Sequence, residues 1–523
     1  MTIGMQIRLW WRDATARERW ITGACIVGAL ALLVGSLALR PSQHSGARAG
    51  TLSASAQSAG TAATAAQAQG QGQTASGEAA TNAAGAGPGA TTGGVVGAVS
   101  GVQGGSTGAS SGGIIGPTVS SELAGLTASD RGVTPSTVKI GFLLANVAGL
   151  SAAGYALNIR TDTPQYAQAL ADYANKNGGV DGRKVVVATR KTDPTSQSDQ
   201  AAACQAMVND QKVFGVVDVG SLSDTPAFDC LANQNQTPFV HNTIWGTDWL
   251  ARSHGMEVGY PAAIDRISQT WSRDLSAMGW LAGHPTVGIL GDKCEATQPA
   301  IENVLKPAFE RAGAGKVVVA MHDCDLQSVA AQPPGFVSQF QLAGVTHVLL
   351  AANYVASAVF MKTAQSIGYH PKYSVSDWWQ LTADTSAKDF DPDQFDGAVA
   401  IASNGLMLQQ SGKAPYPGWQ RCSQVATDAG LPPVIFDARD AELWGMCDNF
   451  FLMIDGLKAA GANPTRQGWA QAIQHLGEHD SVIYGRSFFK PGKVTGSDFV
   501  DTLQWQRGCA CYKSVSDFRP AAA

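Results

Sequence analysis

Residues 175–210 read NKNGGVDGRKVVVATRKTDPTSQSDQAAACQAMVND, and this stretch decides the fold. Gly178 and Gly179 end a helix, because only glycine adopts left-handed backbone angles without penalty. A turn at residues 181–182 leads into the β-branched run 185–187. Such a run is typical of a strand that is covered on both faces.

A second helix is expected after this strand. Ser196 or Ser198 can cap its first turn, and the helix is expected to bury Ala202, Val208 and Cys204. A helix, a turn, a strand and another helix in this order indicate a crossover unit of a parallel sheet.

Two strings in this stretch, GGVDGRKV at 178–185 and TDPTSQSDQAAACQAMV at 192–208, carry a resemblance to a known family. They resemble the first βαβ unit of type I periplasmic solute-binding proteins, the leucine/isoleucine/valine-binding class that serves ABC transporters. The resemblance extends over residues 134–523 and weakens after residue 400. It implies an α/β fold of two Rossmann-like lobes joined by a hinge, with chain segments that cross between them. Lobe 1 is expected to take in residues 134–256 and 404–485, and lobe 2 residues 257–403 and 486–523.

Strand-like and helical runs alternate along the chain in two series. This alternation indicates two mainly parallel sheets with right-handed crossovers. The strands expected in the first series are 138–144, 185–188, 213–219 and 238–241. The second series has expected strands at 286–290, 316–321, 346–351, 373–376, 397–403 and 501–505, with helices at 265–281, 299–312 and 355–367.

The N-terminal part of the chain has the pattern of a membrane anchor. Residues 20–39 carry no charge, and a helix of this length spans the roughly 30 Å hydrocarbon core of a bilayer. An excess of arginine over acid in residues 1–19 places that segment in the cytoplasm. A transmembrane helix that is retained as a signal anchor is therefore favoured, and a cleaved signal peptide is the alternative.

Residues 40–133 form a low-complexity segment of Ala, Gly, Ser, Thr and Gln with very few charges. Such a composition cannot bury enough apolar area to offset the entropy of ordering, so a disordered linker is expected. Residues 41–119 would have an end-to-end distance of about 50 Å as a flexible coil.

The cysteines indicate an oxidising compartment. Cys25 lies in the apolar run, whereas the other eight of the nine follow residue 200. An even number on the exported side indicates disulfides, although eight cysteines allow about 105 pairings and free buried thiols are the alternative. Order along the chain favours the pairs Cys204–Cys230, Cys294–Cys324, Cys422–Cys447 and Cys509–Cys511, and the resemblance supports the first of them. No C-x-x-C pair is present, so no metal site is expected.

Ligands of open α/β sheets bind beyond the carboxyl ends of the strands. The candidate loops are residues 144–155, 220–225, 241–245 and 376–379. The resemblance implies that Ser221 and Ser223 hold a ligand carboxylate, that Thr243 shares this polar clamp, and that Asp377 pairs with a ligand ammonium. Ser223 as a simple helix cap and Asp377 as an exposed turn acid are the alternatives.

Aromatic residues in the same loops depart from the family's usual small side chains. Tyr155, Trp245, Trp378 and Trp379 would line an aromatic pocket, which favours a larger, planar or cationic ligand over leucine or valine. One of the two adjacent tryptophans, Trp378 or Trp379, is expected to pack in the core.

The whole chain excludes several functions. A net charge of −5 without a basic tract argues against nucleic-acid binding. Catalytic and phosphate-loop motifs are absent, so neither an enzyme nor a cofactor is expected. The leading interpretation is an extracytoplasmic protein, anchored by one transmembrane helix or secreted after cleavage, that captures a small amino-acid-like or related polar solute for an ABC permease. The alternative is a membrane-tethered sensor or cell-surface binding module with the same fold.

Overall fold

The computed structural model describes residues 125–146, 148, 160–194, 196–220, 222, 225–405, 418–435 and 440–522. These residues belong to one compact unit, residues 110–523. The predicted cytoplasmic segment 1–19 and transmembrane helix 20–39 lie outside them. Within the described ranges, no helix is both long and apolar enough to cross a bilayer.

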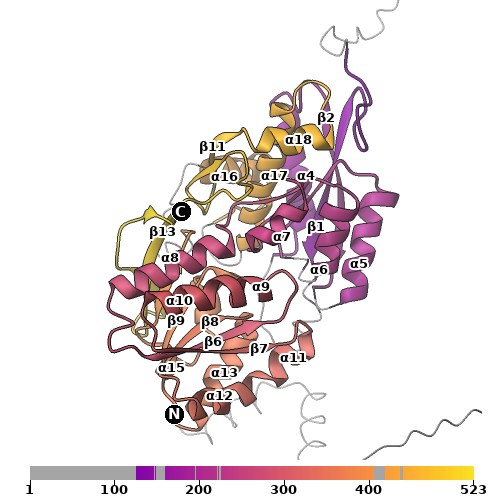
Figure 1. Cartoon of the computed structure of the whole chain (residues 1–523). Coiled ribbons are helices and arrows are strands. Elements are labelled where there is room, and N and C mark those ends of the chain that lie inside the picture. The colour runs from indigo at the N-terminus through magenta and orange to yellow at the C-terminus, as the bar shows by residue number, and fades with distance from the viewer. Residues whose placement is uncertain are drawn as a thin grey trace, which may run out of the picture. The chain divides into compact units, whose positions relative to one another are not determined.

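The first sheet is fully parallel, with the strand order β2-β1-β3-β4-β5. Figure 1 labels two of its strands, β1 and β2. Ile140 on β1 pairs with Val187 on one side and Gly215 on the other. The strands are β1 Thr137–Ala145, β2 Lys184–Thr192, β3 Gly215–Asp218, β4 Phe239–His241 and β5 Glu257–Gly259. The first four confirm the strands that the sequence predicts, whereas β5 was not predicted.

The predicted glycine turn lies between α4 (Thr163–Lys176) and β2. Gly178 and Gly179 both have positive φ angles. A Cβ atom on Gly179 would lie 2.0 Å from the carbonyl oxygen of Arg183. Only glycine fits this position, and the chain therefore turns directly from the helix into the strand.

Ser196 caps α5 (Gln197–Gln205), because its side chain accepts a hydrogen bond from the backbone N–H of Asp199. The predicted burial of Cys204 and Val208 is confirmed, but that of Ala202 is wrong: Ala202 is exposed and Ala203 is buried. With the cap at Ser196, the buried face recurs at three- and four-residue spacing, and Ala202 falls outside it.

Helices from both ends of the folded chain cover the first sheet. The long helix α17 (Ala441–Ala459) packs against it, and Phe450 stacks on Phe142 of β1 at 5.7 Å between ring centroids. Disulfides fasten the covering helices. Cys204–Cys230 joins α5 to the segment Asp229–Gln234, and Cys422–Cys447 joins α16 (Gly418–Asp428) to α17.

The second sheet has the order β14-β13-β10-β9-β8-β6-β7, with β15 paired to β13. Its first five strands along the chain are parallel, and the C-terminal strands are antiparallel additions. The strands are β6 Thr286–Asp292, β7 Lys316–His322, β8 His347–Ala351, β9 Lys372–Ser376, β10 Val399–Ala402, β13 Phe499–Gln506, β14 Cys511–Ser514 and β15 Arg519–Pro520. All six strands predicted for this series are confirmed.

The predicted helices of this series are present as α8 (Ile264–Ala277), the run from Gln298 to Ala312, and α13 (Tyr354–Ser366). The helix α12 (Pro333–Leu342) was not predicted. Its first two residues are prolines, which the first turn tolerates because its N–H groups have no helical partner.

Two chain segments that connect the sheets run side by side. Gly259 at the end of β5 donates a backbone hydrogen bond to Val494 and accepts one from Gly496, at 3.2 and 2.9 Å. The backbone N–H of Ser497 donates to the carbonyl oxygen of Tyr260 at 2.7 Å. We call residues 259–263 and 494–498 the crossing segments.

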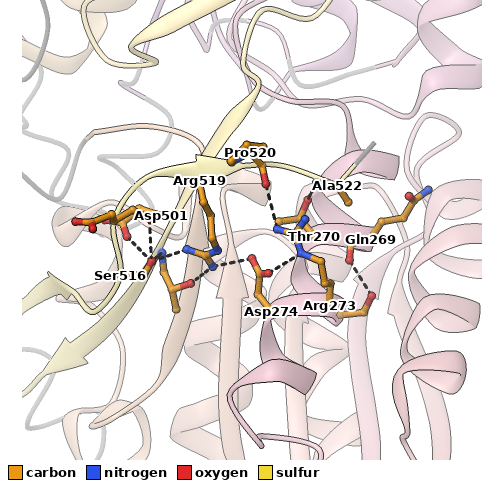
Figure 2. Close-up of polar contacts among 12 residues, drawn as sticks. Gln269, Thr270, Arg273, Asp274, Asp501, Ser516, Arg519, Pro520 and Ala522 are labelled. Carbon is orange, nitrogen blue, oxygen red and sulfur yellow. Dashed lines mark hydrogen bonds and ion pairs between the residues drawn. The ribbon is translucent and has the colours of Figure 1, made fainter.

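The C-terminal tail lies along α8, as Figure 2 shows. Arg519 forms an ion pair with Asp274 at 2.7 Å, and the backbone N–H of Ala522 donates to Thr270 Oγ1 at 2.8 Å. Arg273 donates to the carbonyl oxygen of Pro520 at 3.2 Å. The end of the chain is therefore bound to the helix that begins at the first crossing segment.

Candidate ligand-binding site

The carboxyl ends of β1, β3 and β4 bring three predicted loops to one edge of the first sheet. Of the predicted site residues, Tyr155, Ser221 and Ser223 lie outside the described residues, so their roles stay predictions. Thr243, Trp245, Asp377 and Trp378 are described.

A buried group of polar residues fixes the loop after β4. His241 Nε2 lies 3.0 Å from Glu257 Oε1, and the other Glu257 oxygen accepts from the indole N–H of Trp249 at 3.2 Å. The backbone N–H of Thr243 donates to His241 Nδ1 at 3.1 Å. Since Nδ1 accepts, the ring proton is on Nε2 and donates to Glu257. The half-buried Thr243 is thus positioned by hydrogen bonds internal to this loop.

The helix α17 contributes Glu442 to the same edge, a residue that sequence analysis missed. One carboxylate oxygen, Oε1, accepts from the backbone N–H of Ala145 at 3.2 Å, at the end of β1. The other, Oε2, is buried and has no hydrogen-bond partner among the residues that the structure describes. Burial raises the pKa of Glu442 to about 7, and the nearby Asp218 carboxylate adds to this shift. A buried acid with an open oxygen can accept a ligand donor.

Two amides complete this edge. The side-chain N–H of Asn449 on α17 donates to the carbonyl oxygen of Asp218 at 3.0 Å. Within the described part of the chain, Asn449 Oδ1 and Asn242 Oδ1 are both buried without a hydrogen-bond partner. Asn242 lies against α17, because a Cβ atom on Gly445 would be 2.6 Å from Asn242 Nδ2. We call Glu442, Asn242 and Asn449 the open acceptor group.

Asp377 follows β9 at the carboxyl edge of the second sheet and is 2% exposed. Its Oδ1 accepts from Thr382 Oγ1 and Asn404 Nδ2, and its Oδ2 accepts from the backbone N–H and the hydroxyl of Ser403. Burial raises the pKa of Asp377 to about 6, although these hydrogen bonds counteract the shift. The carboxylate is therefore buried, not an exposed turn acid, and it joins the ends of β9 and β10.

A second buried acid lies at the end of β6. Asp292 accepts from Thr297 Oγ1 and, at 2.8 Å, from the indole N–H of Trp379. Burial raises its pKa. The disulfide Cys294–Cys324 joins the segments that follow β6 and β7, next to Asp292 and the buried His322. This part of the edge is held by internal bonds.

The tryptophans predicted to line the pocket differ in their surroundings. Trp245 is 2% exposed and packs against Phe228 at 5.1 Å between ring centroids. Trp378 is also 2% exposed, whereas Trp379 is only partly buried. Trp378 is thus the one of the adjacent pair that packs in the core. The indole N–H groups of Trp245 and Trp378 are both buried, and neither has a hydrogen-bond partner in the described ranges.

Comparisons with known proteins agree on one fold. A family model described as periplasmic binding protein matches residues 137–508. A search of curated proteins by sequence found no match. Among solved structures, the chain is similar to a fatty acid ABC transporter substrate-binding protein from Thermomonospora curvata, with 15% identity, a TM-score of 0.56, and coverage of 76% of this chain and 95% of that one.

Two further similar structures differ in the ligand that their descriptions name. A leucine-binding protein from Thermotoga maritima has 14% identity and a TM-score of 0.54, with coverage of 73% of this chain and 99% of that one. A solute-binding protein from Rhodopseudomonas palustris BisB5, in complex with 3,4-dihydroxybenzoic acid, has 15% identity and a TM-score of 0.53, with coverage of 74% and 98%. The descriptions of all three structures name binding proteins, and two of them name an ABC transporter.

Proposed function

Because the chain belongs to the periplasmic binding protein family, we propose that it is an extracytoplasmic solute-binding protein for ABC-type uptake. It captures a small amino-acid-like or related polar solute between the carboxyl edges of its two sheets. The observation that carries this proposal is the open acceptor group, because a buried oxygen without a partner is costly unless a ligand donor satisfies it.

The ligand contacts follow from this arrangement. Ser221, Ser223 and Thr243 are proposed to hold the ligand carboxylate. Glu442 Oε2 is proposed to accept from the ammonium group. Asp377 already accepts four hydrogen bonds from its own neighbours, so its proposed part is to close the opposite wall.

Tyr155, Trp245 and Trp378 are proposed as the aromatic wall of the site. The buried indole N–H groups of Trp245 and Trp378 lack partners among the described residues, and a ligand acceptor would satisfy them. Side chains of this size favour a planar or aromatic solute over leucine or valine. A dihydroxybenzoate in one structurally similar protein and leucine in the name of another define the two solute classes to be compared.

A thermal-shift panel of amino acids, amides, polyamines and aromatic acids tests the proposal. A ligand at 100 times its Kd stabilises the native state by about 2.7 kcal/mol, which is a readily measured shift. We expect a stabilising compound among the amino-acid-like or aromatic solutes. A complete panel without any shift would contradict solute binding.

Residues 20–39 are proposed to tether the protein to the membrane as a single transmembrane helix, with residues 40 onward outside the cytoplasm. The four disulfides support an extracytoplasmic location. The mass of the protein in membrane fractions separates the two outcomes: a full-length mass supports the tether, and a mass without the first 39 residues supports secretion after cleavage.

A membrane-tethered sensor with the same fold is the second candidate, favoured by the uncharged run 20–39. Uptake measurements in cells with and without the protein distinguish the two. Loss of uptake of the identified solute supports transport, whereas unchanged uptake with intact solute binding supports sensing.

A further inference from the structure

A cavity of about 630 Å³ lies beside the crossing segments, and no residue of the open acceptor group is among its lining residues. Its walls come from α7 (Thr247–Arg252), the turn that follows it, the start of α8, the C-terminal cap of α18 (Arg466–Ile473) and residues 490–498. This volume is within the range of small-molecule sites. We call this cavity the crossing pocket.

Both crossing segments contribute to the pocket. Ala263 comes from the first, and Val494 and Thr495 come from the second. The two are held together by the hydrogen bonds of Gly259 described above. A ligand in the pocket therefore contacts the two connections that lie between the sheets.

The charges that line the pocket are mostly positive. Arg266, Lys490 and Lys493 lie in its wall with a single acid, Asp498. Asp498 Oδ1 lies 2.6 Å from Arg266 Nη1 and 3.3 Å from Lys493 Nζ. One carboxylate cannot neutralise three cations, and Lys490 has no carboxylate partner among the described residues.

Lys493 adds positive charge to the pocket but offers little direct contact to a ligand. Its side chain is 10% exposed, and its Nζ donates to the carbonyl oxygens of Phe488 and Gly496. Burial lowers the pKa of Lys493 to about 8, with Asp498 opposing the shift and Arg266 and Lys490 adding to it. The charge of Lys493 is thus only partly offset by Asp498, and a nearby anion would stabilise the protonated form of Lys493.

Donors that remain available surround the cavity. Arg266 is held by the C-terminal tail and a crossing segment through Nε and Nη1, which donate to the carbonyl oxygens of Ala522 and Ser497. Its Nη2 group has no partner among the described residues. Lys490 and His254 are exposed in the pocket wall. Donors from two cationic side chains and one imidazole thus line one cavity, an arrangement that suits carboxylates and phosphates.

We propose that the crossing pocket is a second ligand site, which binds a small organic polyanion such as a tricarboxylate or a phosphate ester. Lys490, His254 and Arg266 Nη2 contact the anion, and Lys493 contributes charge. Because both crossing segments line the pocket, an anion bound there favours one arrangement of the two lobes and changes the affinity of the solute site. This coupling rests on the proposed function, whereas binding of the anion does not.

Isothermal titration of citrate and of glucose 6-phosphate into the full-length protein, at constant ionic strength, tests the proposal. We expect saturable binding with one site. Lys490→Gln and His254→Ala should each weaken it about tenfold, the effect of one lost charge-assisted hydrogen bond. Lys184→Gln, an exposed lysine outside the pocket, is the matched control and should leave the affinity unchanged. Absence of saturable binding, or equal weakening in the control, would overturn the proposal.

Two further measurements separate this pocket from the solute site. Glu442→Gln should leave citrate binding intact, so that a failure of solute binding does not imply a failure here. Citrate affinity should fall as the pH rises above about 8, because Lys493 then loses its proton. In Lys493→Gln this decline should disappear. A decline that persists in Lys493→Gln would exclude Lys493 from the pocket's charge.

Discussion

A buried carboxylate lies at the carboxyl edge of each sheet, and the two carboxylates differ in their hydrogen bonds. At the edge of the second sheet, both oxygens of Asp377 are filled by hydrogen bonds from Thr382, Ser403 and Asn404. At the edge of the first, one oxygen of Glu442 accepts a hydrogen bond from the backbone of Ala145, and the other is buried with no partner in the described part of the chain. The carboxylate of Asp377 therefore stabilises the fold through internal hydrogen bonds, whereas the carboxylate of Glu442 offers an open acceptor.

This difference identifies which edge is prepared for a polar ligand group. A carboxylate whose oxygens are filled loses those bonds if a ligand competes for them. A carboxylate with an open oxygen gains a bond and a counter-charge on binding. If substitutions at Asp377 and Glu442 had the same effects in the experiments below, this distinction between the two edges would be wrong.

Asp377→Ala should have the largest effect on stability. The change removes the buried acceptor of the Thr382 hydroxyl and of the backbone N–H and hydroxyl of Ser403, and we expect the free energy of unfolding to fall by about 3 kcal/mol or more. Urea denaturation followed by tryptophan fluorescence measures this loss. Asp389→Ala is the control, because it removes an exposed aspartate from the same part of the chain. It should change the free energy of unfolding by less than about 0.5 kcal/mol.

Glu442→Gln should affect binding and not stability. The glutamine retains an oxygen for the N–H of Ala145 but loses the charge. We expect the affinity for an ammonium-bearing solute to fall about ten- to hundredfold, with no decrease in the free energy of unfolding. Titration calorimetry with the solute from the thermal-shift panel checks this. Unchanged affinity would remove Glu442 from the site.

The pH dependence of solute binding should follow Glu442. Its pKa of about 7 is raised by burial, and a ligand ammonium favours the ionised form, so binding releases a proton. Affinity should therefore rise about tenfold from pH 6 to pH 8 and be constant above that, for a solute whose amine stays protonated. In Glu442→Gln the curve should be flat. A slope that persists in this variant would assign the titration to another group.

Ser403→Ala should have the smallest effect. It removes one hydroxyl bond to Asp377 and leaves the backbone N–H bond in place, so we expect a loss of about 1 kcal/mol in the free energy of unfolding. Combined with Asp377→Ala in a double-mutant cycle, the two losses should not add, because both act on one network. Additive losses would show that Ser403 and Asp377 are energetically independent.

Much of the fold could be predicted because its signals are local. The β-branched run 185–187 and the glycine pair before it determine a strand and a turn without reference to the rest of the chain. The missed elements lacked such signals. The strand β5 has only three residues, which is too few for a clear pattern. The helix α12 begins with two prolines, which are compatible with a helix only in its first turn.

The candidate site was less predictable, because its chemistry depends on residues that are distant in sequence. Nothing near Asp377 shows that Ser403 and Asn404 fill its oxygens, since that requires β9 and β10 to be neighbours. Glu442 lies in a helical apolar pattern, which gives no local sign of a site residue. Its role depends on the end of β1, almost 300 residues earlier.

The connectivity of the disulfides has a consequence for how the protein matures. Each of the eight described cysteines is bonded to its nearest unpaired neighbour along the chain, with separations of 26, 30, 25 and 2 residues. A chain that is translocated from its N-terminus therefore exposes each native pair before the next one emerges. An oxidase that joins cysteines in order of emergence gives the native set directly, and the slow reshuffling that disulfide isomerases catalyse is not required.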